Sequence, residues 1–114
     1  MTTVTFFSEE ERVTGFSVSG HSGYAPEGAD IVCAAVTSAV RLAECTINEV
    51  LGLEASVKAR QKDAFISIRL PRALGDSSDS VCQALLTGMM VYLTQLHEEY
   101  PEHLLVLEHD DSEV

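Results

Sequence analysis

The chain has 114 residues, 46% of them hydrophobic, and a formal net charge of −11. This length suits one core, and we expect a single domain over residues 1–114. The negative charge argues against direct binding of nucleic acid, because phosphate contacts need clustered Lys and Arg. We find no apolar run that reaches the roughly 18 residues of a membrane span and no secretory signal, so the sequence predicts a cytoplasmic protein without a membrane partner.

The charge and the cysteines are unevenly spread. Residues 73–114 hold nine acidic residues and no Lys or Arg, whereas five of the seven basic residues fall in residues 58–72. This acidity either keeps the protein soluble or attracts a basic partner. The three cysteines are odd in number and widely spaced, which argues against a disulfide framework and for a reducing compartment.

The first half of the chain predicts a hairpin followed by a helix. Residues 2–8 are rich in β-branched and aromatic types, and residues 12–19 alternate as a second strand. An apolar helical run follows from about residue 31 to residue 51. We expect Asp30 to be its N-cap and Gly52 to follow its end.

The second half of the chain predicts another pair of strands and another helix. Residues 53–58 and 64–70 are predicted strands, and a long amphipathic helix then begins at Asp76, Ser77 or Ser78 and ends before Pro101. Residues 103–109 form a last strand. The order ββαββαβ predicts a two-layer α/β domain, with two helices packed on one mixed or antiparallel sheet.

Helical spacing aligns the polar side chains of the first helix in one narrow stripe. It comprises Cys33, Thr37, Arg41, Glu44 and Asn48. Almost every other position of this helix is apolar or small. We therefore expect the helix to be buried on two sides, against the sheet and against a second surface.

Cys33 and His21 are the candidate nucleophile and base. The sequence predicts Cys33 in the first helical turn, where unpaired N–H groups and the helix dipole favour a thiolate. His21 lies on a loop with Gly20, Gly23 and Gly28, which permit unusual backbone angles and movement. The alternative is a structural thiol, since free cysteine is among the most buried residue types.

Asp30 and Thr37 have two interpretations each. Asp30 either caps the helix or orients His21 as a third catalytic group. The Thr37 hydroxyl either bonds Cys33, one turn away, or bonds its own helix backbone.

The remaining thiols and imidazoles are weaker candidates. Cys45 and Cys82 have apolar helical neighbours, so we expect both to be buried and structural. His97, His103 and His109 have no Cys or carboxylate spacing typical of a metal site, and we expect neither a metal nor another cofactor.

At these residues the chain resembles the bacterial ribosomal-processing cysteine proteases, the Prp family. The resemblance rests on Gly20-His21, the glycine-containing loop, and Asp30-Ile31-Val32-Cys33-Ala34 at the start of a helix. It implies Cys33 as nucleophile, His21 as base and Asp30 as the family aspartate, with Thr37 where the family has a serine.

The resemblance also implies the reaction and the partners. Family members remove a short N-terminal extension from a large-subunit ribosomal protein, cutting after aromatic residues, and act as homodimers. We expect Ser22, Gly23, Tyr24 and Gly28 to belong to a substrate-binding loop that closes over the peptide. The alternatives are a ribosome-associated binding or assembly module without catalysis, and another thiol-dependent hydrolase such as a thioesterase.

Overall fold

The computed structural model describes residues 1–20, 27–60, 62 and 64–111, except for the side chains of residues 27–30. Its elements follow the predicted order ββαββαβ, with a π-helical extension, η1, after the first helix. Their bounds are β1 Thr2–Glu9, β2 Arg12–Ser19, α1 Glu27–Glu44, η1 Cys45–Val50, β3 Ser56–Arg60, β4 Phe65–Arg69, α2 Asp76–Glu99 and β5 Leu104–Asp110.

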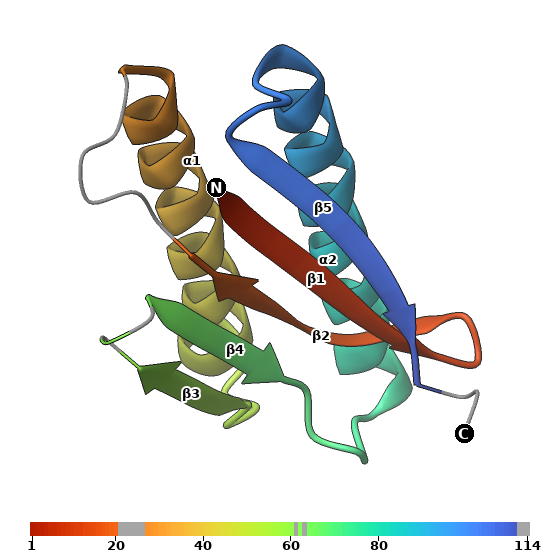
Figure 1. Cartoon of the computed structure of the whole chain (residues 1–114). Helices are drawn as coiled ribbons and strands as arrows, with labels where there is room; N and C mark the ends of the chain where they lie inside the picture. The colour runs from red at the N-terminus through yellow and green to blue at the C-terminus, as the bar shows by residue number, and fades with distance from the viewer. Residues whose placement is uncertain (21–26, 61, 63, 112–114) are drawn as a thin grey trace.

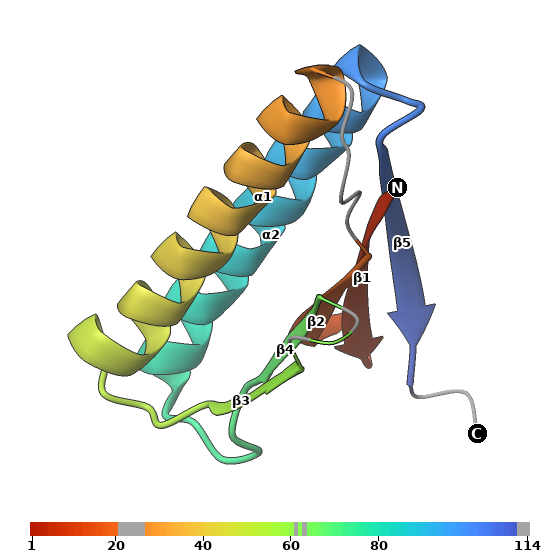
Figure 2. The ribbon, with the colours of Figure 1, turned by 60° about the vertical axis from the view of Figure 1, so that its left-hand side comes forward.

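The five strands form one mixed sheet in the order β3-β4-β2-β1-β5. β1 runs parallel to β5, and the other neighbouring strands are antiparallel. Figure 1 shows the sheet in front of the helices, and Figure 2 shows that α1 and α2 both cover the same face. The predicted two-layer α/β fold is therefore confirmed.

The core lies between the sheet and the two helices. Phe6 of β1 and Phe16 of β2 are buried there, with ring centroids 5.9 Å apart. The spacing of Val32, Val36 and Val40 buries one face of α1 against them, as the helical period requires. This packing fixes the orientation of the polar stripe along α1.

The first helix begins earlier than predicted. α1 starts at Glu27, so Asp30 is its fourth residue and is not the N-cap, and Cys33 lies in the second turn rather than the first. The first four N–H groups of a helix lack partners, and those belong here to residues 27–30. The expected effect of the helix N-terminus on Cys33 is thereby weakened, because it falls off within the first turn.

The start of α2 differs from the prediction, whereas the end of the first helix agrees with it. α2 is capped by Gly75, with Asp76 and Asp79 in its first turn, so none of the predicted capping residues is the cap. The end of the first helix is as predicted, since Gly52 follows it with φ 64°. Asn48 then accepts a hydrogen bond from the Ala55 N–H at 2.7 Å and ties the helix end to the approach to β3.

The segment Ile31–Val50 has a mean hydropathy of 1.3 and matches a membrane span by length and composition. The expectation that no segment would do so is therefore wrong. In the fold, this segment buries Val36, Val40 and Ile47 in the core beneath the sheet. A core helix of a globular protein meets the same criterion as a membrane span.

Candidate active site

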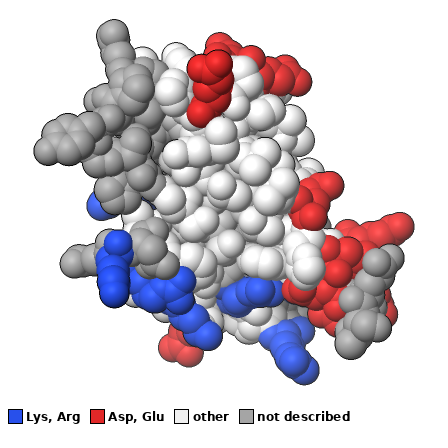
Figure 3. All heavy atoms as spheres, viewed as in Figure 1, with Lys and Arg blue, Asp and Glu red and all other residues white. Residues whose placement is uncertain are grey.

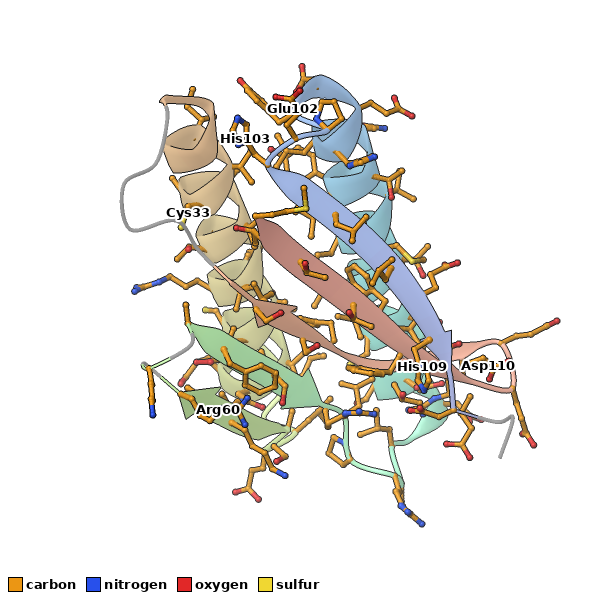
Figure 4. The ribbon with its side chains drawn as sticks, in the orientation of Figure 1. Cys33, Arg60, Glu102, His103, His109 and Asp110 are labelled. Atoms are coloured by element: carbon orange, nitrogen blue, oxygen red, sulfur yellow. The ribbon has the colours of Figure 1, made fainter. Side chains whose placement is uncertain are left out.

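Cys33 is an exposed thiol on α1 that lines a pocket of about 350 Å³. Figure 4 shows it on α1, on the side of the helix near the end of β2. Thr37 and Arg41, one and two turns further along α1, line the same pocket. The first three members of the predicted polar stripe are thus brought together at one opening.

The pocket walls come from three parts of the fold. Val36 and Val40 contribute from α1, and the sheet contributes Val18 of β2 and Ile66 of β4. The remaining lining residues are Thr2, Gly20 and Ala64. The walls are therefore mainly apolar around a thiol, a hydroxyl and a guanidinium, a composition typical of a small-molecule or peptide side-chain site.

Gly20 has a structural reason to be glycine. Its φ is +81°, and a Cβ built there would lie 2.5 Å from the Met1 carbonyl oxygen. Any other residue would be strained in this conformation and would collide with the N-terminus. The chain therefore leaves β2 at the pocket wall, directly before residue 21.

The other site residues expected from the sequence lie outside the described part of the chain. His21, Ser22, Gly23 and Tyr24 are not described, and Gly28 is described only as part of the α1 backbone. Asp30 is likewise described only by its helical backbone. The pairing of Cys33 with His21 therefore stays a prediction.

The three described histidines lie elsewhere, since none of them lines the Cys33 pocket. His97 Nδ1 lies 2.5 Å from the Leu104 carbonyl oxygen and links α2 to β5. His109 Nε2 lies 3.0 Å from Asp111 Oδ1, and its ring packs edge-on against Phe7. In the described segments, no three His, Cys, Asp or Glu residues are grouped to hold a metal ion.

The other two cysteines differ from each other. Cys82 is buried as expected, and burial, followed by the nearby Asp79 charge, raises the pKa of its thiol above the ordinary 9.0. Cys45 is exposed, so the expectation that it is buried is wrong. The apolar neighbours of Cys45 reflect an outer helix surface rather than the core.

Charge is segregated over the sheet face. Figure 3 shows Lys and Arg gathered over β3, β4 and the following loop, whereas most Asp and Glu lie near the β1–β2 turn, the end of β5 and the end of α2. Among the described residues that line the Cys33 pocket, Arg41 alone carries a charge. The acidity of the whole chain thus does not describe the surroundings of this pocket.

Sequence reasoning placed Arg41 in the polar stripe but not among the site residues. The signal was available, because its spacing of eight from Cys33 puts both side chains on one helix face. The wall residues Val18, Ala64 and Ile66 had no comparable signal. They reach the pocket through strand order, which the sequence does not specify.

Comparison with known proteins gives consistent matches. The family described as cysteine protease Prp matches residues 1–105. The ribosomal processing cysteine protease Prp of Bacillus subtilis (strain 168) is 27% identical over 99 residues, covering 87% of this chain and 88% of that protein.

Solved structures share the fold. The essential ribosomal processing protease Prp from S. aureus in complex with a substrate peptide has a TM-score of 0.80 and 24% identity, covering 95% of this chain and 99% of that chain. The same protease with a covalently linked product peptide has a TM-score of 0.72 and 26% identity over the same shares.

Proposed function

This chain belongs to the cysteine protease Prp family, and from that premise we propose that it is a cysteine endopeptidase. Its proposed substrate is the short N-terminal extension of a large-subunit ribosomal protein, in keeping with the name of its Bacillus subtilis relative. The observation that carries the proposal is the exposed thiol of Cys33 at the opening of a mainly apolar pocket. An apolar wall suits the aromatic side chain expected before the cut.

Cys33 is the proposed nucleophile and His21 the proposed base. His21 accepts the thiol proton, and the Cys33 Sγ attacks the scissile carbonyl carbon to form a tetrahedral oxyanion. The C–N bond then breaks, His21 returns the proton to the leaving amine, and an acyl-enzyme remains. Water, deprotonated by His21, hydrolyses the thioester and restores the thiol.

A general base is required because Cys33 lies too far along α1 for the helix N-terminus to assist removal of the thiol proton. The first turn of α1 ends before Cys33, and the dipole effect falls off within that turn. Gly20, which directly precedes His21 in the sequence, lines the pocket. This supports His21 rather than the described histidines, which lie away from the pocket.

Asp30 is proposed to orient His21. Because α1 begins at Glu27, Asp30 is not its N-cap. A carboxylate that holds an imidazole in one tautomer assists proton transfer without reacting itself. Ser22, Gly23, Tyr24 and Gly28 remain the proposed substrate-binding loop.

The proposed setting is the bacterial cytoplasm, where ribosomal proteins are made, and the proposed oligomer is a homodimer. Support for a dimer comes from the outer face of the helix layer. There Leu42 is 63% exposed beside a groove of about 520 Å³ lined by both helices. Exposed apolar surface of this kind commonly marks a protein interface.

The test is mass spectrometry of a synthetic extension peptide incubated with the protein. We expect one cut after an aromatic residue, and a loss of more than about a thousandfold in rate for Cys33→Ala. His21→Ala should lose activity strongly, and Asp30→Asn should lose about tenfold or more at unchanged stability. Cys45→Ala is the matched control, because its thiol is also exposed but lies away from the pocket.

Three results would contradict the proposal. Full cleavage by Cys33→Ala would exclude Cys33 as the nucleophile. Peptide binding without cleavage by the wild type would favour an assembly module. Hydrolysis of a thioester of the same acyl group, with no hydrolysis of the peptide, would favour a thioesterase.

A further inference from the structure

The strand β5 forms one edge of the sheet. Among the strands that the structure describes, it is the last in the order and pairs only with β1, in an unbroken register. Natural proteins commonly protect such edges with charged side chains, Pro or a β-bulge. Residues 104–107 of β5 are all apolar, and the register along β5 has no shift. The outer edge of this strand is therefore a template on which a further strand can pair.

A mainly apolar groove runs beside this edge. It has a volume of about 580 Å³ and lies between α2 and β5, lined by Met90, Val91, Thr94, Gln95, Val106, Leu107 and Glu108. Val91 and Leu107 are 51% and 43% exposed. Successive side chains of a strand point to opposite faces of the sheet, so a strand added to β5 would direct every second side chain toward α2. Apolar side chains at those positions would cover Met90 and Val91.

Acidic side chains surround the groove. Glu108 lines it and is exposed. Figure 4 shows Glu102 just before β5 and Asp110 at its end, and Figure 3 shows other acidic groups near the end of α2. Residues 73–114, which include all of α2 and β5, contain no Lys or Arg. An occupant with complementary charge is therefore basic.

We propose that the β5 edge and its groove dock an extended, basic segment of the protein that the enzyme cleaves. This inference rests on the proposed peptidase function and adds to it a second substrate-binding surface. Backbone hydrogen bonds to β5 align the segment, its apolar side chains fill the groove, and its Lys or Arg side chains meet the acidic groups.

A second copy of this chain fits the edge less well than a basic segment does. A two-fold contact between β5 strands brings the same surface from both copies together. Each copy then contributes Glu108 and the neighbouring acidic groups, and residues 73–114 offer no Lys or Arg from either side. Like charges across a strand pair are destabilising.

The groove lies within reach of the Cys33 pocket. Thr2 lines that pocket and pairs with Leu104, the first residue of β5. Neighbouring strands lie about 4.8 Å apart, so an added strand lies about 10 Å from β1, a distance that about three extended residues span. A chain that leaves the pocket and follows β5 from Leu104 toward Glu108 runs parallel to it. Because the proposed extension is short, the long segment after the cut is the one that docks.

The experiment compares peptides that share one cleavable extension and differ only in the tail after the cut. One has no tail, the second has a tail of alternating Val and Lys, and the third has alternating Val and Glu. The wild type should cleave the Val-Lys peptide with a KM at least about tenfold below that of the tailless peptide, at similar kcat, and the Val-Glu peptide without this gain. Glu108→Lys should lose most of the gain and cleave the tailless peptide as the wild type does.

Glu49→Lys is the matched control, because it makes the same charge change at an exposed glutamate on η1, away from β5 (Figure 1). This variant should keep the full gain. N-methylation of every second backbone N–H of the Val-Lys tail then tests the strand pairing, since alternate N–H groups of a strand face the same neighbour. One phase of methylation should abolish the gain, and the other phase should keep it.

Three results would overturn the inference. The first is an equal KM for the Val-Lys and tailless peptides. The second is the same gain, or the same loss, in both phases of methylation. The third is a change of sedimenting mass in Glu108→Lys, which would assign the edge to a second copy. Each result is distinct from failure of the proposed function, because the tailless peptide would still be cleaved in a reaction that depends on Cys33.

Discussion

The three thiols of this chain lie in three different environments, and this difference separates their chemistry. Cys33 opens onto a pocket, Cys45 faces outward at the start of η1, and Cys82 is buried in α2. Exposure alone therefore does not single out Cys33. What distinguishes it is the pocket that brings Thr37, Arg41 and Gly20 to the same place.

The buried thiol predicts a pH dependence of stability. Burial raises the pKa of Cys82 above 9.0, the value we take for the unfolded chain. As pH rises through the unfolded value, the unfolded chain loses the proton that the folded protein keeps. The unfolded state then binds fewer protons, so the free energy of unfolding falls with pH above about 9.

Urea unfolding at pH 7.5 to 10 measures this effect. Cys82→Ala should be less stable at pH 7.5, because a buried side chain is shortened, but its stability should decline less steeply above pH 9. Cys45→Ala, which alters an exposed thiol, should keep the wild-type slope. Identical slopes in wild type and Cys82→Ala would show that Cys82 ionises alike in both states.

At the scale of elements, a single side chain supports an irregular part of the sheet. On one side Val13 of β2 pairs with Ser8 of β1. On its other side β4 pairs with β2 only over residues 15–18, so Val13 has no strand partner there. Gln83 of α2 compensates. Its Oε1 accepts from the Val13 N–H at 2.8 Å, and its Nε2 donates to the Val13 carbonyl at 2.7 Å. The amide thus substitutes for the missing strand partner and anchors α2 to the sheet.

Gln83→Ala should destabilise the fold by about 1–3 kcal/mol, because it leaves two backbone groups of buried Val13 without partners. For a chain of this size, this corresponds to a fall of at least about 4 °C in Tm, measured by calorimetry. Gln95→Ala is the matched control, since Gln95 is an exposed glutamine on the same helix. Equal Tm values for the two variants would contradict the anchoring role.

The sequence predicts the elements well because their causes are local. β-branched and aromatic composition identifies β1, alternation identifies β2, and the apolar period identifies both helices. The helix starts are less well predicted, because Asp76, Ser77 and Ser78 can all cap, whereas the structure uses Gly75 and leaves Asp76 in the first turn. Acidic residues are favourable there as well, so residue type alone does not fix the boundary.

The site is only partly predictable for a related reason. Cys33, Thr37 and Arg41 follow from helical spacing within one element. Val18 and Ile66 join them because β2 and β4 are neighbours in the sheet, with Val18 opposite Ile66. This pairing links positions 48 residues apart in the sequence, and no local pattern encodes it.

At the scale of the molecule, the helix layer has an apolar surface on its outer side. α1 was expected to be buried on two sides, yet Leu42 and Val50 are 63% and 73% exposed. The sequence indicates that such a face is apolar but not which chain covers it. The same reasoning explains Cys45, which was expected in a core and lies on an exposed helical surface.

The proposed homodimer predicts that this outer face is the interface. Small residues such as Ala39 and Gly88 line the groove between α1 and α2, so the backbones of a second copy can approach closely. Leu42→Glu should place a charge in the dry centre of the interface and shift the protein to monomers. Sedimentation velocity over a concentration series measures the mass directly.

Leu107→Glu is the matched control, because it makes the same change at a leucine that is 43% exposed on β5, the edge strand of the sheet. We expect this variant to remain a dimer. If Leu107→Glu dissociates and Leu42→Glu does not, the copies associate through the sheet edge instead. A wild type that sediments as a monomer at every concentration would contradict the dimer itself, and cleavage by that monomer would show that the Cys33 pocket is complete within one chain.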